Sequence, residues 1–192
     1  MRVGVNSFYE LHELEQIGLK TFGDNVKISR KASIYGAENI SLGNNVRVDD
    51  FCILSGKIRI GNFVHIAAYT GIFAGQAGVT FADYMTASSR CAFYAVSDDY
   101  SGMSMTNPMV PDIYKNVTEQ AIFVGKHVII GSGCTVLPGV TIEEGVAVGA
   151  MSLINKTLSA WNIYGGIPCA RIKTREKELL KKEADFKLRY GV

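Results

Sequence analysis

Three histidines, His12, His65 and His127, are the side chains best suited to move a proton near neutral pH. An imidazole in water titrates near pH ~6.5, so it can act as a general base without a large shift in its pKa. His12 lies in a stretch with a helical pattern, where a surface position is expected. His65 and His127 both fall at positions that are expected to point outward, so either one is open to chemistry.

Asp98 and Asp99 offer a second kind of base. Two adjacent carboxylates can share one proton, which raises the pKa of one of them. A lone aspartate would need its pKa raised by several units through burial before it could serve near neutral pH. A carboxylate can also orient an imidazole, so Asp98 or Asp99 can act beside a histidine as well as replace one.

Arg171, Lys173 and Arg175 place three cations at alternate positions near the end of the chain. Closely spaced guanidinium and ammonium groups are suited to binding phosphates. A run of charge is also common in a solvated segment, and that is the alternative interpretation of these three residues.

Composition excludes several classes of protein. A count of 20 Lys+Arg against 18 Asp+Glu gives a net charge of +2, so the chain lacks the bulk charge of nucleic-acid or membrane-surface binders. The first residues contain no charged region followed by an apolar stretch, and no run reaches the roughly 18 apolar residues of a membrane span. We therefore expect a cytoplasmic protein without an integral membrane segment or a nucleic-acid partner. The four cysteines form no CxxC pair and are expected as buried thiols: Cys52, Cys91, Cys134 and Cys169.

A period of six residues predicts the elements that must position these side chains. Every sixth residue is aliphatic from Leu42 to Ile72, and the series resumes at Phe81 and again from Val124 to Ile154. Neither a helix nor an alternating strand has this period. Three hexapeptides make one triangular coil of about 18 residues, and stacking buries the aliphatic column that a single coil would expose. We therefore predict an all-β fold, a left-handed parallel β-helix of hexapeptide repeats.

Five glycines directly follow core positions of this pattern, where we expect sharp corners with an unusual backbone angle: Gly43, Gly61, Gly125, Gly131 and Gly149. At the two ends, a capping box at Asn6–Glu10 predicts a short helix that ends near Ile17, and Thr174–Tyr190 has the pattern of an amphipathic helix. The expected single domain, 1–192, comprises a cap at 1–25, the β-helix at 26–160 with an inserted loop at 98–119, and a C-terminal segment and helix at 161–192.

The inserted loop, residues 98–119, breaks the repeat in a chain whose other connections are tight. Loops of this length in compact domains are commonly functional or disordered. This loop carries five large side chains, so we expect it to pack against something, with a passive surface excursion as the alternative: Tyr100, Met103, Met105, Met109 and Tyr114. An isolated triangular prism would also leave its long sides half apolar, which favours a homotrimer.

The repeat blocks, the loop and the ending Tyr164–Lys173, YGGIPCARIK, resemble the hexapeptide-repeat acyltransferases, nearest to the galactoside, maltose and O-antigen acetyltransferases. The resemblance runs from about Val26 to Lys173. It implies a trimer with active sites between neighbouring subunits and with acetyl-CoA, the co-substrate, extended along the groove between two β-helices. Matching positions would line the pantetheine channel at Ser132, Ala150, Asn155 and Lys156, and would hold the nucleotide end at Pro168, Arg171 and Lys173.

The chain departs from this family at the catalytic base. The resemblance implies a histidine at the start of the inserted loop, but counting six-residue steps from Phe81 places Asp98 there. His65 precedes Ile66–Tyr69, on a coil whose face in this family meets the inserted loop of the neighbour. We therefore predict His65 of one subunit as the base, with Asp98 or Asp99 of the next as its orienting carboxylate. An aspartate base is the alternative.

The implied activity is an acetyl-CoA-dependent acetyltransferase that acts on a sugar, with O-acetylation in cell-surface polysaccharide biosynthesis as the main prediction. N-acetylation of an amino sugar nucleotide and a non-catalytic trimeric scaffold are the alternatives. A zinc enzyme of the γ-carbonic-anhydrase kind would need three imidazoles, for which too few histidines remain, so no metal is expected. Sugar contacts are predicted for four side chains, although aromatic residues in a repeat protein are as often packing: Tyr69, Tyr94, Tyr100 and Asn107.

Overall fold

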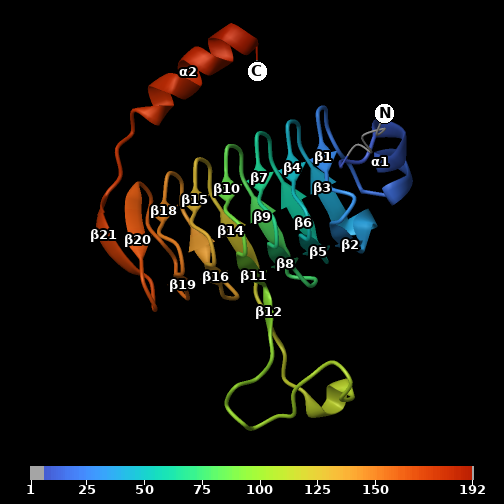
Figure 1. Ribbon diagram of the computed structural model, residues 1–192. Coiled ribbons are helices and arrows are strands. Elements are labelled where there is room, and N and C mark those ends of the chain that lie inside the picture. The colour runs from blue at the N-terminus through green and yellow to red at the C-terminus, as the bar shows by residue number, and fades with distance from the viewer. Residues whose placement is uncertain (1–6, 192) are drawn as a thin grey trace.

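Stacked parallel coils form the body of the molecule, which the computed structural model describes for residues 7–191 (Figure 1). Each coil contributes short strands to three parallel sheets in turn. Successive coils pair in register, as His65 does with Arg47 in the coil before it and with Thr86 in the coil after it. The fold class is thereby confirmed as a left-handed parallel β-helix of hexapeptide repeats.

We name the three sheets by one outward residue each. The His65 side contains β1 (Lys27–Ile28), β4 (Arg47–Val48), β7 (His65–Ile66), β10 (Thr86–Ala87), β15 (Ile129–Ile130), β18 (Ala147–Val148), β20 (Asn162–Gly165) and β21 (Ala170–Thr174). The Tyr94 side contains β2 (Ser33–Tyr35), β5 (Ile53–Ser55), β8 (Gly71–Phe73), β11 (Ala92–Tyr94), β16 (Thr135–Val136) and β19 (Leu153–Ile154). The Arg59 side contains β3 (Ile40–Leu42), β6 (Ile58–Ile60), β9 (Val79–Phe81), β14 (Ile122–Val124) and β17 (Thr141–Ile142).

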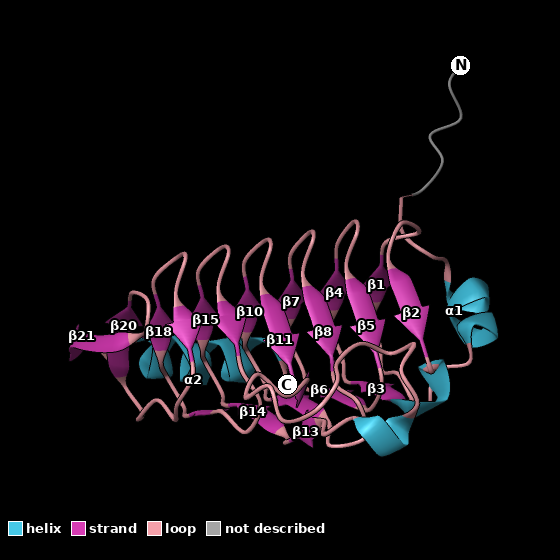
Figure 2. Ribbon diagram, turned by 90° about the horizontal axis from the view of Figure 1, so that it is seen from below, coloured by secondary structure: helices cyan, strands magenta, loops and turns pink. Residues whose placement is uncertain are grey.

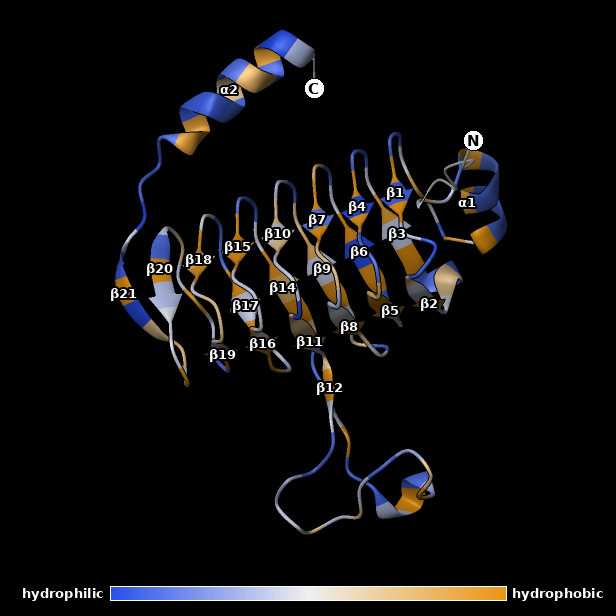
Figure 3. Cartoon of the chain, viewed as in Figure 1, coloured by the Kyte–Doolittle hydropathy of each residue, from blue (hydrophilic) through white to orange (hydrophobic). Residues whose placement is uncertain are grey.

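Inward side chains at the six-residue spacing form one continuous core. Ile60, Ile66 and Ile72, from three successive strands, are each at most 2% exposed. All four cysteines are buried free thiols, as predicted, and Sγ of Cys91 donates to the carbonyl of Gly131 at 3.2 Å. Figure 3 shows the resulting alternation of hydrophobic strands and hydrophilic corners along the stack.

The five glycines that follow core positions do not have the unusual backbone angle that was predicted, since none has a positive φ. At four of the five, an added Cβ would come within 3 Å of the next coil. On Gly131, for example, it would lie 2.5 Å from the backbone nitrogen of Ala150. Close stacking of the coils is therefore the reason for glycine here, and the positive φ angles fall two residues later, as at Phe63 with φ of 57°.

The N-terminal end of the stack is covered by α1 (Leu11–Ile17), with Glu10 as its N-cap. The backbone N–H of Glu10 donates to the carboxylate of Glu13, which forms the capping box. The helix therefore begins later than predicted from Asn6–Glu10, and Asn6 itself lies outside the described residues. Leu14 is buried in the core, and Ile17 at the end of α1 packs against it.

The C-terminal helix, α2 (Leu179–Tyr190), begins later than predicted from Thr174–Tyr190. Thr174 ends β21, which is antiparallel to β20, and the segment that follows is anchored to the stack by Arg175. α2 lies over the corner between the Arg59 side and the His65 side, where Phe186 contacts the rings of Phe63 and Tyr84 edge-on. Figures 1 and 2 show it running beside the stack, opposite the inserted loop. No helix within residues 7–191 is long and apolar enough to cross a membrane.

The inserted loop leaves the stack through β12 (Val96–Ser97) and returns through β13 (Thr118–Glu119), which pair antiparallel. Beyond this base the loop projects away from the coils (Figure 1). Its large side chains are exposed; Tyr100 is 94% exposed and Met103 is 90% exposed. The packing partner predicted for them is thus not the loop's own β-helix. The single turns η1 (Ala37–Asn39) and η2 (Asp112–Tyr114) complete the secondary structure of the described residues.

Candidate active site

The imidazole of His65, at the start of β7, is held by a carboxylate. Its Nε2 lies 2.8 Å from Oδ2 of Asp49, and Oδ1 of the same carboxylate accepts a hydrogen bond from Nε of Arg47 at 2.7 Å. Burial would raise the pKa of Asp49, but the hydrogen bonds from His65 and Arg47 outweigh it, so the pKa lies below its ordinary value. Asp49 therefore stays ionised and favours the proton on Nε2, which leaves Nδ1 as the nitrogen that can accept one.

Asp49 is a functional candidate that the sequence prediction missed. Its signal is the coil period, because β4 and β7 pair Arg47 with His65 and thereby bring Asp49, two residues further on, beside the imidazole. An orienting carboxylate is thus present within the chain. The contact predicted between His65 and Asp98 or Asp99 of a second chain stays a prediction.

Asp98 and Asp99 follow β12 at the base of the loop. The backbone N–H of Ser101 donates to Oδ1 of Asp99 at 2.8 Å, and this hydrogen bond lowers the pKa of that carboxyl. Asp99 is therefore a poorer proton acceptor than an ordinary aspartate. Asp98 is exposed, and its carboxylate is without a hydrogen-bond partner in the described part of the chain. Of the two, Asp98 is the free carboxylate.

His65 and Asp98 lie at different corners of the stack. The corner that follows His65 joins the His65 side to the Tyr94 side, whereas the loop leaves from the far edge of the Tyr94 side. Crossing that side takes the residues from Cys91 to Ala95, which span roughly 15 Å at about 3.3 Å per residue. The two side chains are therefore too far apart for one proton transfer within a single chain.

His127 is unsuited to act as a base because it is enclosed. The residue is 8% exposed, its ring stacks on that of Tyr84 with centroids 5.1 Å apart, and its Nε2 lies 2.7 Å from Oε2 of Glu183 on α2. The outward position predicted for it is thus covered by α2. No group of three or more His, Cys, Asp or Glu residues that could hold a metal ion occurs within residues 7–191.

Arg171 and Lys173 remain available for phosphate on the exposed strand β21. They are two residues apart, and the pairing of β21 with β20 shifts register between them. Arg171 donates from Nε to Oδ1 of Asn162 at 2.7 Å and from Nη2 to Oγ1 of Thr174 at 2.9 Å, and neither cation forms an ion pair within residues 7–191. Arg175 is not available for phosphate, so its grouping with Arg171 and Lys173 as a phosphate-binding cation was wrong. Its Nη1 donates to three backbone carbonyls, the shortest at 2.8 Å to His127, so it anchors the segment before α2.

Ser132 and Ala150 lie one above the other at the corner between the His65 side and the Tyr94 side. The residues before them are Gly131 and Gly149, so this part of the corner carries little side-chain bulk. Such a strip has room for an extended chain along the stack. The other residues predicted for the donor are exposed at the next corner and between β20 and β21, and their roles stay predictions: Asn155, Lys156 and Pro168.

Tyr69 and Tyr94 each use one ring face for packing. Tyr69 stacks on Phe51 with ring centroids 4.9 Å apart, and Tyr94 stacks on Phe73 at 5.0 Å. The two stacks border a hollow of about 250 Å³ on the Tyr94 side. One face of each tyrosine is therefore committed to the protein, as is common for aromatic residues in a repeat.

Two sugar contacts were predicted on the loop, Tyr100 and Asn107, and only Asn107 has a side-chain hydrogen bond to the loop itself. Tyr100 is almost wholly exposed. Oδ1 of Asn107 accepts a hydrogen bond from the backbone N–H of Met109 at 2.9 Å, so that oxygen already stabilises a turn. The amide nitrogen of Asn107 and the second lone pair of its oxygen are left for a sugar contact.

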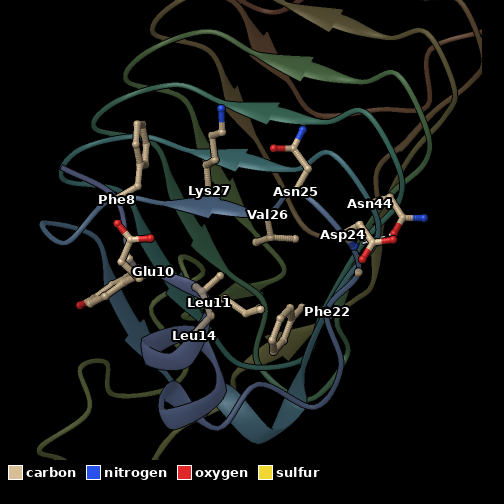
Figure 4. Close-up of a pocket in the computed structure, with 12 residues that line it drawn as sticks. Phe8, Glu10, Leu11, Leu14, Phe22, Asp24, Asn25, Val26, Lys27 and Asn44 are labelled. Atoms are coloured by element: carbon tan, nitrogen blue, oxygen red, sulfur yellow. Dashed lines mark hydrogen bonds between the residues drawn. The ribbon is translucent and has the colours of Figure 1, made fainter. Parts of the chain in front are cut away.

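A cavity of about 610 Å³ lies at the N-terminal end of the stack, between α1 and the first coil (Figure 4). Leu11, Leu14 and Phe22 form its apolar wall, and the backbone N–H of Asp24 donates to Oδ1 of Asn44 at its edge. None of the residues predicted for catalysis lines it. The cavity is therefore a gap in the packing between α1 and the first coil.

Comparisons with known proteins place this arrangement in context. The family model described as bacterial transferase hexapeptide (six repeats) matches residues 121–156. A dTDP-4-amino-4,6-dideoxy-D-glucose acyltransferase of Escherichia coli is 48% identical over 178 residues, which cover 91% of this chain and 92% of that protein. An Escherichia coli K12 protein named for lipopolysaccharide O-acetyl transfer is 26% identical over 79% of this chain and 76% of its own.

Among solved structures, AntD, an N-acyltransferase from Bacillus cereus, matches with a TM-score of 0.95 and 47% identity. The match covers 98% of this chain and 100% of AntD, which is bound there to dTDP and 3-hydroxybutyryl-CoA. AntD has also been solved with coenzyme A in variants of one aspartate and one serine, ten positions apart in its chain.

Proposed function

The chain belongs to the bacterial hexapeptide-repeat transferases and is a coenzyme A-dependent sugar acyltransferase, and we propose that it acylates the amino group of a nucleotide-linked amino sugar. The observation that carries this proposal is the 48% identity, over 91% of the chain, to an acyltransferase of a dTDP-linked 4-amino sugar. N-acylation, the alternative drawn from the sequence, is thereby favoured over the O-acetylation that was the main prediction.

The reaction requires a neutral amine. A sugar amine is largely protonated near neutral pH, so a base must remove a proton before the nitrogen attacks the thioester carbonyl. Attack forms the C–N bond and a tetrahedral intermediate, and collapse of that intermediate breaks the C–S bond. Coenzyme A leaves as a thiolate and takes up a proton, so the products are an amide and a free thiol.

Two side chains fit the proton transfer. His65 presents Nδ1, because its Nε2 faces the ionised carboxylate of Asp49. Asp98 presents an exposed carboxylate at the place where the six-residue count puts the base of related enzymes. In the proposed mechanism His65 keeps the role of base that was predicted from the sequence and removes the proton. Asp98, predicted to orient His65, instead attracts the protonated amine by its charge, because Asp49 already orients the ring. A carboxylate in this role fits an amine acceptor better than a hydroxyl.

This mechanism needs two chains. Ser88 and Asp98 are separated by the same ten positions as the serine and the aspartate that were varied in AntD. Ser88 lies just after β10, at the corner that also follows His65, whereas Asp98 lies at the far edge of the Tyr94 side. One amino sugar can touch both corners only where two chains meet. A homotrimer with three shared sites is therefore part of the proposal.

A thiol-release assay tests the proposal. Purified protein receives acetyl-CoA or 3-hydroxybutyryl-CoA as donor and dTDP-4-amino-4,6-dideoxyglucose as acceptor, with a matched dTDP-sugar that carries a hydroxyl in place of the amine as control. We expect thiol release with the amine alone, together with a product of the mass of the amide. Equal turnover of the hydroxyl sugar would contradict N-acylation, and turnover of neither would contradict a nucleotide sugar as the acceptor.

A further inference from the structure

Three cations without an ionic partner line one groove on the Arg59 side. Lys20, Lys57 and Arg59 are exposed, and within residues 7–191 no ion pair or side-chain hydrogen bond is formed with any of them. The groove has a volume of about 430 Å³, within the range of roughly 300–1,000 Å³ that is usual for sites of small ligands. Three other cations of the first coils are instead paired with acids: Arg30, Lys31 and Arg47.

The groove is built by stacking of successive coils. Arg59 stands in an outward column with Ser41 in the coil before it and Thr80 in the coil after it, all in parallel register. Lys57 precedes the same strand, and its stem passes close to Gly78, where an added Cβ would lie 3.6 Å from Cδ of the lysine. The side chains of Ser41 and Thr80 are half-buried and give the floor two hydroxyl groups, beside the ring of Phe123 in the next coil, and the rim is cationic.

The third cation comes from another element. Lys20 follows α1, and its backbone N–H is fixed by hydrogen bonds to the carbonyls of Ala37 and Ile40. Asn39, from the turn η1, also lines the groove. Two cations of one strand region and a third from a distant part of the chain thus line the same hollow. Several cations around one hollow suit the binding of a diphosphate.

We propose that this groove binds the diphosphate of the nucleotide sugar acceptor, an inference that rests on the proposed function. Donor and acceptor are both polyanions, so they must approach the reacting amine from different directions. Arg171 and Lys173, which form no ion pair within residues 7–191, lie at the C-terminal end of the stack, which is the end predicted for the donor. The acceptor's phosphates then belong toward the N-terminal end, where Lys20, Lys57 and Arg59 lie.

The distance from the loop fits this assignment. Lys57 is on the corner two coils before the one that carries Asp98, and adjacent coils are about 4.8 Å apart, so the two positions are separated by roughly 10 Å along the stack. A hexose together with the diphosphate on its anomeric carbon spans a distance of this order. The sugar would lie near Asp98, with the phosphates on Lys57 and Arg59 and the nucleoside toward Ser41 and Lys20.

Calorimetry with dTDP alone tests the groove without any acyl transfer. In the Lys57→Ala/Arg59→Ala variant we expect dTDP to bind at least about 10-fold more weakly, because two charge-assisted contacts are lost. Arg59→Lys should recover part of this loss, and inorganic pyrophosphate should compete with dTDP on the wild-type protein. Lys182→Ala, an exposed cation on α2 that the groove does not include, is the control and should bind dTDP normally. All variants should bind coenzyme A as the wild type does.

The outcomes separate this inference from the proposed function. If wild-type protein binds dTDP and the double variant binds it equally well, the groove assignment is overturned while N-acylation of a nucleotide sugar stands. If wild-type protein binds no dTDP and does not turn over the nucleotide amino sugar, the proposed function and the groove both fall. A loss of coenzyme A binding as large as the loss of dTDP binding would also contradict a groove specific to the acceptor.

Discussion

At the scale of single residues, the reactive group of this account is an imidazole whose partner lies 16 positions earlier in the chain. Asp49 keeps Nε2 of His65 occupied and leaves Nδ1 to accept a proton, at a side chain that is 40% exposed. This geometry suits a general base, since a carboxylate both orients the ring and stabilises the charge that forms on it.

Removing the imidazole should therefore be the severe change. We expect His65→Ala to lower kcat by about 10²–10⁴-fold, while coenzyme A binding survives. Asp49→Asn should cost less, because it disturbs the orientation of the ring without removing the base. Asp50→Asn, the neighbouring carboxylate that binds Ser29 and Lys31, is the control and should leave kcat nearly unchanged. Full activity in His65→Ala, with a severe loss in Asp98→Asn, would make the aspartate the base.

Among the cations near the C-terminus, Arg171 and Lys173 should contribute to binding of the donor, and Arg175 should contribute to stability. Arg171→Ala and Lys173→Ala should raise the KM for acyl-CoA with little change in kcat, because phosphate contacts far from the thioester hold ground and transition states alike. Arg175→Ala should leave that KM unchanged and lower stability by about 1–3 kcal/mol, since three carbonyls lose their donor. Steady-state kinetics and thermal melts distinguish the two. A raised KM only in Arg175→Ala would reverse this assignment.

At the scale of elements, α2 is fixed to the stack by one carboxylate. Oε1 of Glu183 accepts hydrogen bonds from Nζ of Lys126 at 2.6 Å and of Lys187 at 2.8 Å, and Oε2 faces Nε2 of His127. Burial raises the pKa of Glu183, but these hydrogen bonds outweigh it and lower the pKa to about 2. The folded state thus binds the ionised form more strongly than the unfolded chain does.

This depressed pKa predicts a pH dependence of stability. Ionised Glu183 stabilises the fold above its ordinary pKa of 4.5, and the contribution is lost as pH falls from there toward about 2. Glu183→Gln should therefore lower the free energy of unfolding at pH 7 by about 2 kcal/mol, which is measured as a lower Tm. The Tm of this variant should also fall less steeply than that of the wild type between about pH 5 and pH 3. Asp185→Asn, an exposed acid on the same helix, is the control. Equal Tm values for Glu183→Gln and wild type at pH 7 would contradict the role of this carboxylate.

At the scale of the whole molecule, the loop and the distribution of site residues both require further copies of the chain. Met103 and Met109 are each 90% exposed, and His65 and Asp98 stand at different corners. We predict a homotrimer, in which the loop of one chain covers its neighbour. Light scattering at micromolar concentration should give three times the mass of one chain. A monomer under these conditions would contradict both the trimer and the shared site.

The sequence predicts the stack well because one six-residue period acts on every coil, so each buried position is repeated many times. Local features with a single occurrence were predicted less well. The start of α2 was placed too early because the cationic pattern before Leu179 also suits the exposed strand β21. Arg175 was grouped with phosphate-binding residues because its anchoring role depends on carbonyls of His127 and Gly145, which only the folded corner brings near it. Asp49 was missed because its contact with His65 joins two adjacent coils, and only the register between β4 and β7 shows that the two side chains meet.

The most direct test of the central claim is subunit complementation with the nucleotide amino sugar as acceptor. His65→Ala chains and Asp98→Asn chains are unfolded together, refolded as a mixture, and assayed for amide formation, with mixed oligomers verified by native mass spectrometry. If each site takes His65 from one chain and Asp98 from the next, about a quarter of the sites in a random mixture are intact, so activity should return to that fraction of wild type. Mixed oligomers with no more activity than the two variants measured separately would contradict a site shared between His65 and Asp98.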